Sequence, residues 1–187
     1  MEEEVTFIIE ETSEKMNKTV QHLDGELGKV RAGKANPKML EVVIVDYYGT
    51  MTPLAQIANI NTPDARTIAI QPWDRKMIPL IEKAIMAANL GMNPDNNGEI
   101  VRINVPPLTE ERRKDLVKQV KKLGEDAKVT VRNTRRDSND DLKKLKKDGL
   151  PEDQEKDAQD RVQKLTDKYI QNIDELLVKK EKDIMTV

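Results

Sequence analysis

The fold of this chain is decided by the stretch Val105-Pro106-Pro107-Leu108-Thr109-Glu110-Glu111, where a strand-like segment ends and a long helix begins. The paired prolines stiffen this connection, because each ring fixes φ and removes a backbone donor. Thr109 is a natural N-cap, and the two glutamates after it favour the positive end of a helix. We therefore predict that a helix begins at about residue 110.

Apolar residues that recur in steps of three and four predict three long helices. The second helix continues as far as Gly149 and Pro151, which form a stop followed by a restart. The first helix runs from Val5 to Val30, and the third follows from Glu152. Each helix carries one apolar stripe that it cannot bury alone, so the simplest packing is an antiparallel three-helix bundle.

Between the first two helices the pattern changes to short β-branched and aromatic runs. Strand-like runs cover residues 41–48, 51–57, 67–71 and 99–105, and a helical pattern covers residues 76–89. We interpret residues 91–98 as a loop and Trp73 as a packing residue at a strand end. The prediction is an α+β fold, L-shaped overall, in which a small β/α/β domain (31–106) is inserted into a bundle domain (1–30 and 107–187).

The two crossings between the predicted domains are short, and their residue types decide where the chain can bend. Gly33 lies in the first crossing and can adopt backbone conformations that other residues avoid. The second crossing contains Val105, Pro106 and Pro107, and its prolines restrict where bending occurs. We therefore expect these residues to form a hinge.

The composition restricts the classes of function. The chain has no cysteine and one histidine, His22, which argues against thiol chemistry, zinc sites and Ser-His-Asp catalysis. It contains no phosphate-binding loop and no dinucleotide fingerprint. No apolar stretch approaches the roughly 20 residues of a membrane span, and the N-terminus is acidic. We expect a cytoplasmic protein that is not an enzyme and holds neither a cofactor nor a metal.

The charge is distributed unevenly along the chain. The whole sequence has a net charge of -2, but the segment from Arg112 to Lys147 holds 14 basic and 6 acidic residues. This segment therefore carries a surplus of +8, and the rest of the chain sums to -10. A clustered basic surface on an acidic protein is typical of a site that binds nucleic-acid phosphates.

The run Val131-Arg132-Asn133-Thr134-Arg135-Arg136-Asp137 concentrates this charge on the second helix. Arginine suits phosphate binding, because its planar fork engages two oxygens and keeps its charge. Arg135 lies near the edge of the apolar stripe. At about 100° per residue, four further residues share the side that faces away from this stripe: Arg132, Arg136, Asn139 and Lys143.

An alternative interpretation of the same run is a solvated charged face. Asp137, Asp140 and Asp141 are interleaved with the cations and could pair with Lys or Arg three or four residues away. Terminal cations such as Lys146 and Lys147 also complement the C-terminal end of a helix. The pattern alone leaves both interpretations open.

Four motifs make the chain resemble the bacterial ribosome recycling factor family along its whole length. They are Val30-Arg31-Ala32-Gly33-Lys34-Ala35, Gln71-Pro72-Trp73-Asp74, the run from Ile103 to Arg113, and Val131 to Asp137. The chain departs from the family pattern at Lys34, where arginine is frequent, at Asn97, where aspartate is frequent, and at Ser138, where alanine is usual.

The resemblance implies a function in translation. It implies that the bundle binds large-subunit ribosomal RNA after termination, and that elongation factor G with GTP then helps to split the subunits and release the mRNA. The anchors would be Arg132, Arg135 and Arg136, together with Arg31, Arg112 and Arg113. We expect a monomer without a small-molecule substrate. The rival hypothesis is a helical adaptor that binds proteins through its acidic C-terminal helix.

Overall fold

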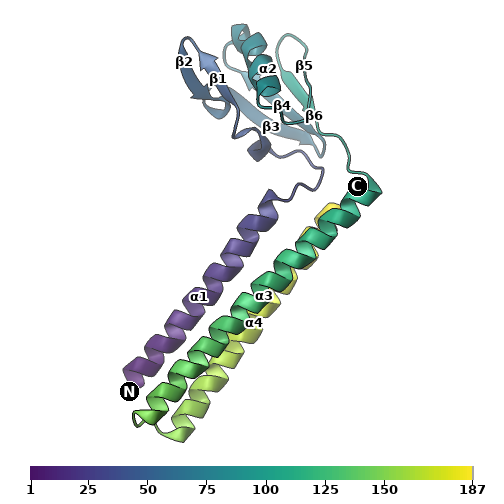
Figure 1. Ribbon diagram of the computed structural model, residues 1–187. Coiled ribbons are helices and arrows are strands. Elements are labelled where there is room, and N and C mark those ends of the chain that lie inside the picture. Colours follow the sequence, from purple (N-terminus) through teal and green to yellow (C-terminus); the bar gives the residue numbers. More distant parts are fainter. Residues whose placement is uncertain (187) are drawn as a thin grey trace. The chain divides into compact units, whose positions relative to one another are not determined.

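The computed structural model describes residues 1–186, and its contacts divide the chain into two compact units (Figure 1). The helical unit consists of residues 1–32 and of the chain from residue 110 onward. The α/β unit consists of residues 33–109. The sequence placed the boundaries at 30/31 and 106/107, whereas the contacts place them at 32/33 and 109/110.

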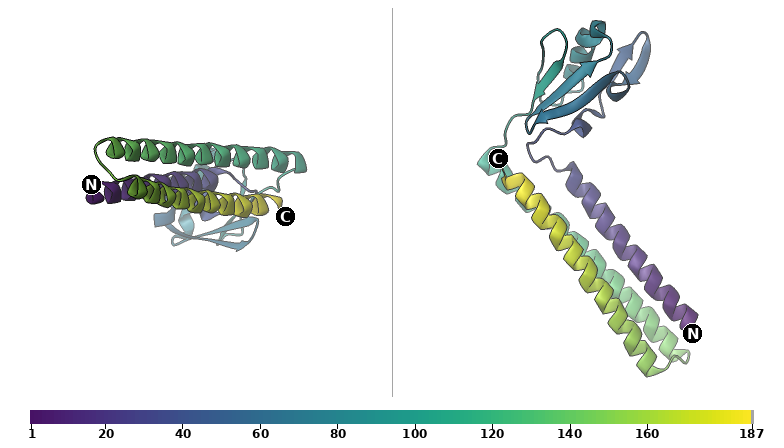
Figure 2. Two further views of the ribbon diagram at one scale, coloured as in Figure 1. Left: turned by 90° about the horizontal axis from the view of Figure 1, so that it is seen from below. Right: turned by 180° about the vertical axis from the view of Figure 1, so that it is seen from behind.

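The helical unit consists of α1 (Glu2–Lys29), α3 (Glu110–Lys147) and α4 (Glu152–Met185). Figures 1 and 2 show the three helices side by side, with α3 antiparallel to both others. The predicted antiparallel three-helix bundle is therefore confirmed. Its buried apolar side chains come from all three helices and include Met16, Leu23, Leu27, Val120, Val131, Leu142, Val162, Ile173 and Ile184.

The turn between α3 and α4 has the predicted stop and restart. Gly149 has a φ of +113°, and the N–H of Leu150 donates to the carbonyl of Leu145, which closes the end of α3. Pro151 then precedes the first turn of α4. Lys146 spans the turn to Glu155, whose side chain is buried, with an N–O distance of 2.9 Å. This hydrogen bond raises the pKa of the Lys146 ammonium.

Gly124 allows α3 and α4 to approach closely. A Cβ atom at this position would lie 2.3 Å from Cδ1 and 2.9 Å from Cγ of Leu177 on α4. By contrast, a Cβ atom at Gly25 of α1 would meet nothing within 4 Å. The two glycines therefore make a matched pair, since only one of them is required by packing.

We expect the steric conflict introduced by Gly124→Ala to cost about 1–3 kcal/mol of the free energy of unfolding, because the Leu177 side chain must be displaced or α4 must move away from α3. This cost should exceed the gain of about 1 kcal/mol that alanine brings to a helix interior. Gly25→Ala should show that gain without the cost. Urea unfolding followed by circular dichroism measures both changes. Equal stabilisation by the two substitutions would contradict the close approach at Gly124.

The α/β unit contains a hairpin, a four-stranded antiparallel sheet and one helix. The hairpin pairs β1 (Ile44–Tyr47) with β2 (Thr50–Pro53). The sheet has the order β3-β4-β6-β5, and α2 (Ile78–Ala87) shares its core. The sheet strands are β3 (Ala58–Asp64), β4 (Thr67–Pro72), β5 (Pro94–Asn96) and β6 (Val101–Asn104). The 3-10 helices are η1 (Pro37–Leu40), η2 (Leu54–Gln56) and η3 (Arg75–Met77).

The structure differs from the sequence-based prediction at both edges of this sheet. β3 was not predicted, and β5 lies in the segment interpreted as a loop. The predicted strand 51–57 is divided into β2 and the 3-10 helix η2. Both missed strands are polar and largely exposed, because an edge strand is held by backbone pairing on one side and needs little apolar alternation.

Trp73 is not the packing residue that the sequence suggested, because its side chain is 74% exposed. Successive residues of a strand point to opposite sides, and Pro72 occupies the buried side. The ring of Tyr48, also exposed, lies edge-on to Tyr47, with 4.8 Å between ring centroids. The hydroxyl of Tyr48 donates to the carboxylate of Asp74, which lowers the pKa of Asp74. Three exposed aromatic side chains therefore belong to the α/β unit.

Candidate nucleic-acid interface

The outer side of α3 carries exposed cations at fixed intervals. Arg132, Arg136 and Lys143 are all exposed, and we call these three residues the α3 basic face. At a rise of about 1.5 Å per residue, Arg132 and Arg136 are about 6 Å apart along the helix, and Lys143 lies about 10 Å further on. Such spacing on one rigid helix suits binding to consecutive phosphates.

Two of the three interleaved aspartates, Asp140 and Asp141, pair with lysines and not with these arginines. Asp140 lies 3.7 Å from Nζ of Lys143, and Asp141 lies 2.7 Å from Nζ of Lys144. The second contact raises the pKa of the Lys144 ammonium. Within residues 1–186, neither Arg132 nor Arg136 forms an ion pair or a side-chain hydrogen bond. The intrahelical ion pairs expected of a solvated charged face are therefore found at Lys143 and Lys144.

Two other predicted residues on α3 are only partly exposed. Arg135 is half-buried, and its Nη1 donates to Oε1 of Gln163 on α4 at 3.3 Å. Asn139 is also half-buried, and its Oδ1 is buried with no hydrogen-bond partner among the described residues. Both side chains thus flank the α3 basic face but are partly held by the bundle.

The remaining predicted cations lie far from this face along the helix. Arg112 is exposed and Arg113 half-buried in the first turn of α3, roughly 30 Å from Arg132 at the helical rise. Arg31 is exposed just after α1. Lys118 and Lys122 belong to the same basic segment but were not predicted as site residues. Both are exposed, and at about 100° per residue they share the outer side of α3 with Arg136.

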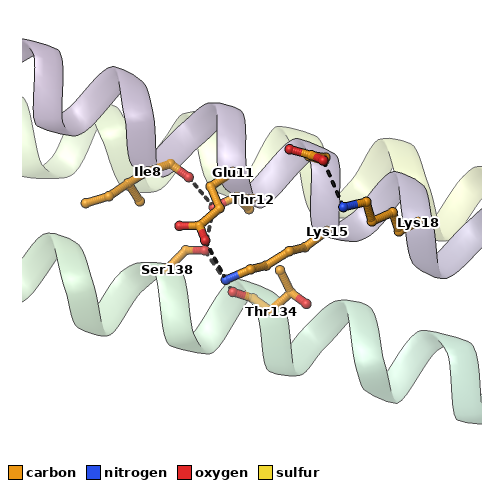
Figure 3. Close-up of polar contacts among 8 residues, drawn as sticks. Ile8, Glu11, Thr12, Lys15, Lys18, Thr134 and Ser138 are labelled. Carbon is orange, nitrogen blue, oxygen red and sulfur yellow. Dashed lines mark hydrogen bonds and ion pairs between the residues drawn. The ribbon is translucent and has the colours of Figure 1, made fainter.

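A buried pair of hydroxyl groups joins α1 to α3 behind the α3 basic face (Figure 3). Oγ1 of Thr12 lies 2.5 Å from Oγ of Ser138, and both side chains are buried. Each hydroxyl also lies within hydrogen-bond distance of a carbonyl in its own helix, Ile8 for Thr12 and Thr134 for Ser138. The two hydroxyl groups have two protons to donate and three contacts in which they take part. If one hydroxyl is removed, the other can still donate to the carbonyl of its own helix.

We therefore expect Ser138→Ala to lower the free energy of unfolding by less than about 1 kcal/mol, because no buried donor loses its acceptor. RNA binding should not change, since Ser138 faces the core. Thermal unfolding and RNA titration of the variant measure the two effects. A loss of several kcal/mol would show that the interhelical hydrogen bond stabilises the bundle more than this exchange of partners allows.

The predicted hinge residues differ in how firmly the α/β unit holds them. Val105 is buried, and its N–H donates to the carbonyl of Arg66 at 2.7 Å. Pro106 and Pro107 are exposed. Gly33 has a φ of +73°, and a Cβ atom there would lie 2.7 Å from Cγ of Leu108. Gly33 is therefore required both by its backbone conformation and by the nearby leucine.

Residues 1–186 contain no group of three or more His, Asp or Glu side chains that could hold a metal ion. In the same residues, no helix combines the length and the apolar character that crossing a membrane requires.

The sequence profile of the ribosome recycling factor family matches residues 23–185. The chain belongs to the ribosome recycling factor family. It is 57% identical to the ribosome-recycling factor of Flavobacterium psychrophilum over 187 residues, which is 100% of both chains. It is 56% identical to that of Porphyromonas gingivalis over 185 residues, which cover 98% of this chain and 100% of the relative.

Solved structures of the family share this fold. A solution structure of a ribosome recycling factor is 41% identical, covers 98% of each chain and has a TM-score of 0.76. A second structure models the T. thermophilus ribosome recycling factor and the E. coli elongation factor G on the E. coli post-termination complex. Its factor is 45% identical, covers 97% of this chain and 99% of its own, and has a TM-score of 0.62. The family is one of translation factors.

Proposed function

We propose that this member of the family binds ribosomal RNA of the large subunit after termination, through the α3 basic face. Arg132 and Arg136 would contact phosphates directly, with Lys143, Arg135 and Asn139 beside them. Arg31, Arg112 and Arg113 would add contacts at the other end of α3. The observation that carries this proposal is that Arg132 and Arg136 are exposed and form no ion pair within residues 1–186.

The absence of internal partners matters for the free energy of binding. An arginine in an internal ion pair must give up that pair before it engages a phosphate, whereas these two can engage it directly. By contrast, Lys143 and Lys144 form ion pairs with Asp140 and Asp141. These lysines contribute mainly to the long-range electrostatic field that attracts RNA. Arginine also binds phosphate bidentately, so the two arginines should position the RNA as well as attract it.

We further propose that the factor acts in the cytoplasm as a monomer, together with elongation factor G and GTP, to dissociate the subunits and release the mRNA. A related structure in which a recycling factor and elongation factor G occupy the post-termination complex supports this proposal. Movement of the α/β unit about Gly33, Pro106 and Pro107 would convert the action of elongation factor G into separation of the subunits. Val105, buried in the α/β unit, would mark the end of the flexible segment.

Co-sedimentation with isolated large ribosomal subunits over a salt series tests the RNA proposal, with small subunits as the parallel control. Contacts with phosphates release counterions, so log K should fall with log salt concentration by about 0.7–0.9 per contact. Two arginines alone therefore predict a slope of about -1.4 to -1.8. An affinity that does not change with salt concentration would favour the adaptor hypothesis, because binding through an apolar protein interface depends little on ionic strength.

The proposed role of GTP needs a separate measurement. Light scattering of post-termination ribosomes reports dissociation into subunits. We expect dissociation only when the factor, elongation factor G and GTP are all present. Equal dissociation with elongation factor G alone would contradict a role for this chain.

A further inference from the structure

A groove lies between α1 and α3, on a different side of α3 from its basic face. Its volume is about 460 Å³, within the range of roughly 300–1,000 Å³ typical of small-ligand sites. Its apolar residues are Leu23 of α1 with Leu123 and Ala127 of α3. Its polar residues are Lys18, Thr19, His22, Glu26, Asp126 and Thr130. All of these residues belong to the helical unit.

Small side chains on α3 explain why the bundle leaves space for the groove near Leu123 and Ala127. Gly124 brings α3 onto Leu177 of α4, and Ala127 presents a single methyl group on the next turn. Further along α3 the corresponding core positions are filled by Val131 and Leu142, both fully buried. The same α1–α3 seam is closed there by the contact between Thr12 and Ser138 (Figure 3). The groove is therefore a local feature of the bundle.

The charged groups of the groove leave one carboxylate unmatched. Lys18 is bound along α1 to Glu14 at 2.8 Å (Figure 3), and this hydrogen bond raises the pKa of Lys18. Glu26 is bound to Lys29 at 2.9 Å, which lowers the pKa of Glu26. Asp126 is exposed and forms no ion pair within residues 1–186. The groove thus combines an apolar floor with an excess of negative charge at one wall.

We propose that this groove binds a small organic cation with an apolar body. The body would lie on Leu23, Leu123 and Ala127, and the ammonium group would face Asp126. Apolar burial favours the body, and the free carboxylate selects a cation over a neutral or anionic analogue. The occupant is a ligand and not a substrate, because the groove holds no group arranged for chemistry. This binding is independent of the RNA proposal, since no residue is shared with the α3 basic face.

Heteronuclear NMR titration with three probes of one shape tests the proposal: 2-naphthylmethylamine, 2-naphthylmethanol and 2-naphthoate. We expect the amine to shift the amide signals of Leu23, Ala127 and Thr130, and to bind at least about threefold more tightly than the alcohol, as an exposed ion pair allows. The naphthoate should bind most weakly. Asp126→Asn should abolish the preference for the amine, and Asp115→Asn, which makes the same charge change elsewhere on α3, should preserve it.

Variants that fill the groove provide a second test of the proposal. Thr130→Phe, at the exposed rim, should remove binding of the amine and the alcohol alike, and Thr19→Phe repeats the test from α1 if the first variant folds poorly. The double variant Arg132→Ala/Arg136→Ala should bind the amine as the wild type does, which separates this site from the RNA site. Equal affinity for amine and alcohol, signals that shift elsewhere, or unchanged binding after occlusion would each overturn the proposal.

Discussion

Replacing Arg132 and Arg136 together with alanine should lower the affinity for large ribosomal subunits by about two orders of magnitude at low salt. Each substitution removes a charge-assisted hydrogen bond to phosphate worth about 1.5 kcal/mol, which is about tenfold in affinity. The salt slope should become shallower by about 1.4–1.8, which is about 0.7–0.9 for each lost contact. Co-sedimentation over a salt series measures both quantities. The fold should be unaffected, because neither arginine pairs within residues 1–186.

Two further variants make this result specific. Arg161→Ala/Lys164→Ala removes the same charge from exposed positions on α4 and should change the affinity only slightly. Arg132→Lys/Arg136→Lys keeps the charge but loses the planar fork, so its affinity should lie between those of the wild type and the alanine variant. If the α4 variant bound as poorly as the α3 variant, net charge and not the α3 basic face would determine binding.

Replacing Gly33 with alanine should slow subunit dissociation by about tenfold while leaving binding to the large subunit unchanged. A left-handed conformation costs a residue with a side chain about 1–2 kcal/mol, and 1.4 kcal/mol corresponds to about tenfold in rate. The new Cβ would also lie 2.7 Å from Cγ of Leu108, so the first crossing must adopt another path. Light scattering measures the rate of dissociation, and co-sedimentation measures binding.

Matched variants separate the two causes. Gly98→Ala has the same left-handed constraint, with a φ of +89°, but a Cβ there meets nothing within 4 Å, and it should preserve recycling. Gly33→Ala/Leu108→Ala removes the steric conflict and should recover part of the rate. A proline at position 33 is a poor test of rigidity, because proline requires a φ near about -65° and Gly33 has +73°. Normal dissociation by Gly33→Ala would contradict the hinge proposal.

The elements that could be predicted from the sequence are those with a strong apolar period. The three long helices each bury one stripe, and the central strands β4 and β6 are buried on alternate residues. β3 and β5 occupy the two edges of the sheet and have polar sequences, so no periodicity marked them. Their pairing depends on the neighbouring backbone, which a pattern of side chains does not encode.

The basic character of α3 could also be predicted, but the environment of its individual side chains could not. A helical wheel places Arg135 and Asn139 near Arg132, yet only the structure shows that Arg135 contacts Gln163 of α4 and that Oδ1 of Asn139 is buried. The sequence equally left open which cations the interleaved aspartates would engage. The structure resolves this choice, because Asp140 and Asp141 contact Lys143 and Lys144. Trp73 was misjudged for the same reason, since exposure depends on tertiary packing.

Because Trp73 is exposed, it can serve as an intrinsic fluorescence probe of binding. It is the only tryptophan of the chain, and it belongs to the α/β unit. Its indole is already in water, so a blue shift in fluorescence emission reports that another molecule has covered this surface. Stopped-flow fluorescence can therefore time the arrival of a partner at the α/β unit without any attached dye. Binding confined to the helical unit should leave the emission unchanged.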